Sequence, residues 1–226
     1  MNDHALEIAD WIRPDRCALV VVDVQNDFCH PSGALAQMGN DVSLVSSMMP
    51  AIHRLVTGAR HMRVPRIFVR TELSSWFESP AWNMRGRAGK VFDAERVPAV
   101  RAGTWGAELF ELEPAPGELV LAKYRYSAFA YTPLELALRS IGRETVVLAG
   151  TATHQCVEAT ARDAIGLGFY PVLVRDATAS RTLAYHQMAV EDFSAHLGYV
   201  TSSTELVDSW GQSVRSSVGE EEAVVG

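Results

Sequence analysis

The chain has 226 residues, of which 48% are hydrophobic and 21% charged, so it is long and apolar enough to form one sizeable core. Its net charge of −7 gives no electrostatic reason to expect nucleic acid or an anionic membrane as a partner, which favours a small molecule instead. The apolar run Ala18–Val22 is too short to span a bilayer, and the acidic N-terminus MNDHALEIAD is unlike a signal peptide, so we predict a cytoplasmic protein.

Five short apolar runs rich in β-branched residues are expected to be strands. None of them alternates apolar with polar residues, which indicates burial on both faces, as in a parallel sheet. The runs are CALVVV at Cys17–Val22, RIFV at Arg66–Val69, LVLA at Leu119–Ala122, TVVLA at Thr145–Ala149 and PVLV at Pro171–Val174.

Helical patterns lie between these runs. Residues 41–62 carry apolar side chains at helical spacing, and Thr132-Pro133-Leu134-Glu135 is typical of a capping box that opens a helix ending at Ile141. Two further helices are expected at Val157–Leu167 and Leu183–His196, each ending close to a glycine. This alternation predicts an α/β fold, with a doubly wound, mostly parallel sheet and helices on both faces in three layers. We expect a single domain over residues 1–210 and a mobile polar tail over 211–226.

The segment from Thr71 to Gly106 has no clear periodicity and is rich in tryptophan, arginine and glycine. A loop of this length inside a compact domain is usually functional. We therefore expect Trp76, Trp82, Asn83 and Arg85 to cover a ligand cleft.

Reactive side chains follow three of the expected strands. Asp23 comes directly after the first run, Lys123 directly after the third, and the heptapeptide GTATHQC, which ends in Cys156, follows the fourth. Ligands of an open parallel sheet bind outside the carboxyl ends of its strands. The sequence therefore predicts that these three side chains share one site.

Cys156 can be interpreted as a buried structural thiol, a metal ligand or a nucleophile. The cysteines at positions 17, 29 and 156 form neither an even disulfide set nor a CxxC pair, which argues against zinc held by thiolates. In the first turn of the following helix, free backbone N–H groups favour a thiolate, so the sulfur is predicted to be acidic and nucleophilic. Asp23 could then take the thiol proton, and Lys123 could keep Asp23 ionised.

These motifs resemble the Asp–Lys–Cys triad of the isochorismatase-like cysteine hydrolases. The likeness rests on VVVDVQNDF around Asp23, LAKYRYSAF around Lys123 and AGTATHQCVEATARDA around Cys156. Within that family the motifs look most like those of the ureidoacrylate amidohydrolases. The resemblance implies a Rossmann-like fold, no cofactor, and a homo-oligomer, either a dimer or a tetramer. It also implies a cis peptide between Thr151 and Ala152, with the N–H groups of Ala152 and Cys156 forming an oxyanion hole.

The chain departs from the family at two places. Most relatives carry Asp or Asn two residues before the cysteine, where this chain has His154. Nicotinamidase-like members bind a metal through Asp and histidines after the second strand, and the corresponding RTELSSWFESPAW lacks histidine. We therefore predict that the site holds no metal.

The expected function is hydrolysis of a C–N bond in a small amide or ureido (carbamoyl) compound, with release of ammonia through a thioester. Gln25, Asn26 and Tyr126 are further candidates for substrate binding, and a substrate carboxylate could bind Arg85, Arg87 or Arg125. Two alternatives stay open at this point: hydrolysis of a vinyl ether, with Asp23 as the acid, and a non-catalytic protein that uses Cys156 for binding or redox sensing.

Overall fold

The computed structural model describes residues 7–84 and 98–224, with side chains of the last helix described up to residue 213. The described residues form a six-stranded sheet in the order β3-β2-β1-β4-β5-β6, in which every neighbouring pair is parallel. The strands are β1 (Cys17–Val22), β2 (Arg66–Thr71), β3 (Leu119–Lys123), β4 (Thr145–Thr151), β5 (Tyr170–Ala179) and β6 (Tyr199–Thr201). The predicted α/β sheet is thus confirmed, and β6 is an additional strand.

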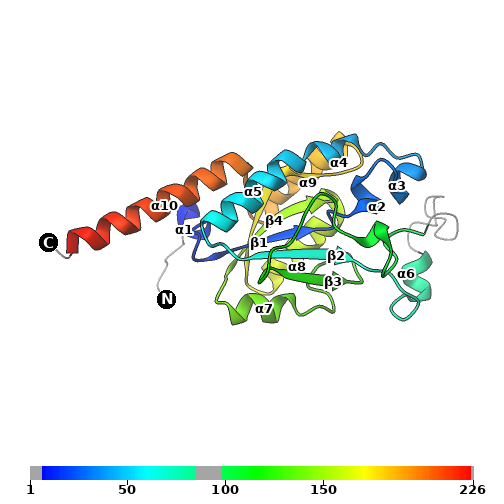
Figure 1. The fold of residues 1–226 in the computed structure, drawn as a ribbon, viewed down its shortest axis with the longest axis horizontal. Coiled ribbons are helices and arrows are strands. Elements are labelled where there is room, and N and C mark those ends of the chain that lie inside the picture. The colour runs from blue at the N-terminus through cyan, green and yellow to red at the C-terminus, as the bar shows by residue number, and fades with distance from the viewer. Residues whose placement is uncertain (1–6, 85–97, 225–226) are drawn as a thin grey trace.

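Helices connect the strands and lie against the sheet (Figure 1). In chain order the helical elements are α1 (Ile8–Trp11), α2 (Asn26–Cys29), α3 (Ala34–Gln37), α4 (Ser43–Ser47), α5 (Met49–His61), α6 (Pro80–Met84), the 3₁₀ turn η2 (Trp105–Ala107), α7 (Leu134–Ser140), the π-helical turn η3 (Thr153–Val157), α8 (Glu158–Gly166), α9 (Leu183–His196) and α10 (Ser203–Val224).

The two faces of the sheet carry separate apolar cores. Leu19 and Val21 of β1 pack with residues of α5 and α10, whereas Val20 and Val22 of the same strand pack with residues of α7 and α8. Figure 1 shows α5 and α10 along one side of the sheet and α7 along the other. Because successive side chains of a strand point to opposite faces, both sets have to be apolar, which explains the unbroken run CALVVV.

Two helical predictions differ from the structure. The single helix expected over residues 41–62 is divided into α4 and α5, which meet at Met48. Pro50 explains the break, because proline has no N–H and fits a helix only in its first turn. Residues 211–224, predicted to be a mobile tail, continue α10 as a helix. None of the helices in the described part of the chain combines the length and apolar character that a membrane span requires.

Candidate active site

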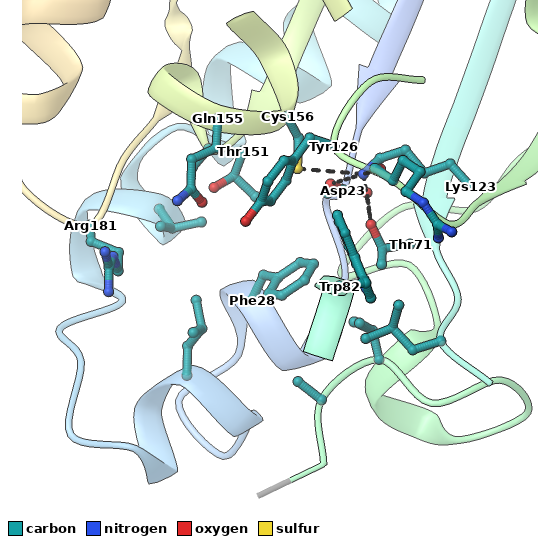
Figure 2. A pocket seen from close by; sticks show the side chains of 17 residues that line it. Asp23, Phe28, Thr71, Trp82, Lys123, Tyr126, Thr151, Gln155, Cys156 and Arg181 are labelled. Carbon is teal, nitrogen blue, oxygen red and sulfur yellow. Dashed lines mark hydrogen bonds and ion pairs between the residues drawn. The ribbon is translucent and has the colours of Figure 1, made fainter. Parts of the chain in front are cut away.

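The carboxyl ends of β1, β3 and β4 bring the three reactive residues together (Figure 2). Lys123 ends β3, and its Nζ lies 2.8 Å from Asp23 Oδ2 and 3.4 Å from Cys156 Sγ. Asp23 follows β1, and Cys156 lies in η3, directly after β4. Asp23 and Lys123 are buried, whereas part of the surface of Cys156 is exposed although its sulfur is enclosed by the site. The strand-end interpretation of the sequence therefore places all three side chains correctly.

The chain reaches Cys156 through a tightly packed turn. Gly150 adopts a φ of 112°, and a Cβ atom at this position would lie 2.0 Å from the carbonyl oxygen of Val22. Only glycine fits this close approach of β4 to β1. The peptide between Thr151 and Ala152 is cis, as the resemblance implied, and η3 then leads into α8.

A cavity of about 240 Å³ opens beside the three residues. Its polar lining includes Asp23, Lys123 and Cys156, and the remainder is largely apolar. The ring of Trp82 lies against that of Tyr126, with centroids 5.0 Å apart, and both of these candidate residues line the cavity. Further lining residues are Phe28, Leu35, Val45, Leu73, Ala99 and Val100. The cavity is thus a largely apolar space with charged side chains, Asp23 and Lys123, at one side, as is common in sites that bind small molecules.

Four other candidates lie outside the cavity lining. Gln25 is buried and donates its amide to the carbonyls of Thr71 and Ala107, and the Asn26 amide donates to the Trp105 carbonyl. These amides hold loops rather than face the cavity. Trp76 is 89% exposed, and Asn83 of α6 is also exposed.

Of the arginines, Arg85 and Arg87 lie outside the described residues. Arg125 lines the cavity, but its guanidinium donates to the carbonyls of Phe77 and Tyr124 and lies 5.1 Å from the Trp82 ring centroid.

Arg181 is a cavity residue that the sequence did not single out. It is partly buried, and among the described residues its guanidinium has neither a hydrogen bond nor an ion pair. Figure 2 shows it across the cavity from Lys123. The sequence pattern ended the fifth strand at Val174, whereas β5 runs on to Ala179. Had the predicted strand ended at Ala179, Arg181 would have been expected at the same edge of the sheet as the other reactive side chains.

The charge state of Cys156 differs from the sequence prediction. Burial raises the pKa of the Cys156 thiol to about 12, because Lys123 only partly offsets it and the negative charge of Asp23 adds to the rise. Burial also disfavours the charge on Lys123, but attraction to Asp23 and Cys156 outweighs it and raises the lysine pKa. The prediction of an acidic sulfur therefore does not hold in these surroundings, because burial and Asp23 favour the protonated thiol beside the ion pair of Lys123 and Asp23.

We expect the thiolate absorbance near 240 nm to distinguish these two states. The difference spectrum between the wild type and Cys156→Ala should stay flat from neutral pH to about pH 9, because the pKa of the thiol lies well above this range. Cys17 and Cys29 are present in both proteins and do not contribute to the difference, and burial also raises the pKa of each to about 12. A titration step below pH 8 that is lost in Cys156→Ala would contradict this assignment.

Among the side chains that the structure describes, in residues 7–83 and 98–213, no three of His, Cys, Asp or Glu gather in a way that could hold a metal ion. The basic side chains that line the cavity are Lys123, Arg125 and Arg181.

Comparison with known proteins gives consistent matches over most of the chain. A family model described as the isochorismatase domain matches residues 17–205. The ureidoacrylate amidohydrolase RutB of Methylobacterium radiotolerans is 30% identical over 219 residues, which cover 91% of this chain and 84% of that protein.

Solved structures of similar proteins also match most of the chain. An N-carbamoylsarcosine amidase from Thermoplasma acidophilum superposes with a TM-score of 0.66 at 26% identity, covering 83% of this chain and 96% of that one. A cysteine hydrolase from Pseudomonas syringae pv. phaseolicola superposes with a TM-score of 0.79 over 90% of this chain and 96% of that one, and its 24% identity supports the fold alone.

Proposed function

The chain belongs to the isochorismatase family of hydrolases, and from this premise we propose that it is a cysteine-dependent amidohydrolase that releases ammonia from a small ureido or amide acid. The observation that carries the proposal is the position of Lys123 Nζ, within 2.8 Å of Asp23 Oδ2 and 3.4 Å of Cys156 Sγ, beside a largely apolar cavity. A nucleophile, a proton acceptor and a fixed cation at one point suit acyl transfer.

Attack begins from the neutral thiol. As Cys156 Sγ forms a bond to the carbonyl carbon, its proton passes to the carboxylate of Asp23, and the carbonyl oxygen becomes an oxyanion. The backbone N–H groups of Ala152 and Cys156, next to the cis peptide, donate hydrogen bonds to that oxyanion. Proton transfer together with attack avoids a free thiolate, which the raised thiol pKa makes costly.

Collapse of the tetrahedral intermediate breaks the C–N bond. The protonated Asp23 gives its proton to the departing nitrogen, which leaves as ammonia, and the acyl group stays on Cys156 as a thioester or thiocarbamate. Asp23 then deprotonates a water that attacks the acyl carbon, and the sulfur leaves and regains the proton. Between these transfers the ammonium of Lys123, 2.8 Å from Asp23 Oδ2, supplies the positive charge beside Asp23.

Arg181 suggests why the substrate would be an acid. Its guanidinium faces the cavity without an ion pair among the described residues, on the side opposite Lys123 (Figure 2). An arginine presents parallel donors that match a carboxylate. A ureido acid could thus place its carboxylate at Arg181 and its carbamoyl group at Cys156. The name of the Methylobacterium relative, a ureidoacrylate amidohydrolase, agrees with this substrate class.

The test is ammonia release from matched pairs of ureido and amide compounds that differ in having a free carboxylate or a neutral carboxamide tail. We expect turnover of the acids, and we expect Arg181→Gln to raise their KM by about 10- to 100-fold with kcat little changed, because a charged hydrogen bond is lost. The neutral compounds should be unaffected by this substitution.

Arg175→Gln is the matched control, because Arg175 is exposed and pairs with Glu205 away from the cavity. Absence of ammonia from every compound would contradict the proposed activity. Equal effects of Arg181→Gln on acids and neutral compounds would instead contradict only the role of Arg181.

A further inference from the structure

We infer that Thr71, the last residue of β2, is a positioning residue that makes Oδ2 of Asp23 the oxygen that carries the proton. This inference rests on the proposed role of Asp23 as the acid and base. Thr71 is buried, and its hydroxyl lies 3.0 Å from Asp23 Oδ1 and 2.7 Å from Lys123 Nζ. Figure 2 shows the hydroxyl beside both groups.

The direction of these two hydrogen bonds follows from their chemistry. An ammonium has donors but no acceptor, so Lys123 must donate to the Thr71 oxygen. The single hydroxyl proton of Thr71 is then free to point at the carboxylate, and Asp23 Oδ1 accepts it. One of the acceptor positions of Asp23 Oδ1 is therefore taken by the Thr71 hydroxyl.

The other oxygen of Asp23 is left for the reaction. Oδ2 forms the ion pair with Lys123 at 2.8 Å, yet it accepts no hydrogen bond of ordinary geometry within the described part of the chain. Buried acceptors are usually satisfied, so an unsatisfied one in a cavity often has a catalytic use. Oδ2 is thus the oxygen with capacity to take the proton of Cys156 and to return it to the leaving group.

Thr71 also limits the orientation of the lysine. Two of the three ammonium hydrogens serve the Thr71 hydroxyl and the Arg125 carbonyl, which is 3.0 Å from Nζ. One hydrogen remains for the side where Asp23 Oδ2 and Cys156 Sγ lie. These two hydrogen bonds fix the rotamer of Lys123, so its ammonium faces Asp23 and Cys156 before the reaction begins.

Gln25 holds the backbone of Thr71 in place. Its amide accepts from the Thr71 N–H at 2.8 Å and donates to the Thr71 carbonyl at 2.9 Å, and it also donates to the Ala107 carbonyl. The sheet register pairs Thr71 with Lys123 across β2 and β3. Both the side-chain amide and the neighbouring strand thus fix the hydroxyl within reach of its partners.

The hydroxyl can be tested apart from the volume of the side chain. Thr71→Val keeps the shape and removes the hydroxyl, and we expect kcat for ammonia release to fall on the order of 100-fold, with KM changed by less than about threefold. Thr71→Ser restores the hydroxyl and should recover most of the activity. Thr71→Ala serves as a smaller hydroxyl-free variant if the valine protein does not fold, as judged by circular dichroism and thermal melting.

Thr145→Val is the matched control, because Thr145 is a buried threonine at the opposite end of the sheet whose hydroxyl has no partner in the described structure. It should leave kcat unchanged. Folded Thr71→Val protein with wild-type kcat, or Thr71→Ser protein as slow as Thr71→Val, would overturn the inference.

Alkylation of Cys156 by iodoacetamide at pH 7 separates this inference from the proposed function. A neutral thiol needs a base when it attacks the reagent, so Thr71→Val should slow alkylation about 10-fold and Thr71→Ser should restore it. If the wild type releases no ammonia but this pattern appears, the proposed function fails and the role of Thr71 stands. Equal alkylation rates in the wild type and Thr71→Val would contradict the role of Thr71 whatever the substrate.

Discussion

Cys156→Ala is expected to lower kcat for ammonia release by at least about 1,000-fold, because the covalent intermediate can no longer form. Wild-type protein quenched during turnover should carry an acyl adduct on the peptide that contains Cys156, detected by intact mass and peptide mapping. The side chain is partly exposed, and its removal leaves the ion pair of Asp23 and Lys123 in place. The variant should therefore fold normally and lose activity only.

Cys17→Ala provides the comparison for this variant. Cys17 begins β1, at the opposite end of the strand from Asp23, so its replacement should leave kcat unchanged. Persistent activity in Cys156→Ala would exclude a thioester and favour vinyl ether hydrolysis, in which Asp23 protonates the substrate. Release of pyruvate from isochorismate by the same variant would identify that reaction.

The position of the three reactive side chains could be predicted from sequence because it depends only on the order of the apolar runs and on the residues that follow them. The carboxyl ends of parallel strands meet at one edge, so Asp23, Lys123 and the turn before Cys156 had to lie together. Thr71 and Arg181 were not identified from the sequence, because their positions at the site follow from where β2 and β5 end. The runs of apolar residues stopped at Val69 and Val174, whereas β2 and β5 continue into polar residues.

Other features depended on contacts that no local pattern contains. The strand β6 has three residues, too few for a recognisable pattern, and the start of α10 is capped from another strand, since Asp176 accepts hydrogen bonds from the Ser203 N–H and hydroxyl. The thiol pKa was mispredicted for a related reason. The helix start favours a thiolate locally, but burial and the carboxylate of Asp23 dominate in the folded protein.

The aromatic candidates illustrate the same limit. Trp76 and Trp82 are six positions apart in a segment without periodicity, and only Trp82 contacts Tyr126 and lines the cavity. Composition can indicate that such a loop has a function, but the side chain that faces the ligand is decided by the packing of the loop. Gln25 likewise looked suited to a substrate amide and instead holds the backbone of Thr71.

Asp23→Asn is expected to lower kcat on the order of 1,000-fold and to destabilise the protein by about 3–5 kcal/mol, because Lys123 stays buried without a counter-charge. Activity is measured by ammonia release and stability by urea unfolding. Asp15→Asn is the matched control, since its ion pair with Arg13 is exposed and should contribute no more than about 1 kcal/mol.

The pH dependence of the Asp23→Asn deficit follows from the shifted pKa of Lys123. In the wild type that pKa is raised, so the stability it contributes is present below the ordinary lysine value and is lost as pH rises through the higher folded value. In Asp23→Asn the attraction is gone and burial lowers the lysine pKa. The deficit should therefore shrink between neutral pH and about pH 10, as Lys123 becomes neutral in the folded variant.

The double variant Asp23→Leu/Lys123→Met separates folding from catalysis. Replacing both members of a buried ion pair by apolar residues of similar size is often neutral or stabilising, so this protein should recover most of the stability lost in Asp23→Asn. It should nevertheless remain inactive, because no group is left to move the proton of Cys156. A double variant as unstable as Asp23→Asn would mean that the deficit does not come from the unpaired lysine, and any recovered turnover would contradict the assignment of Asp23 as the acid and base.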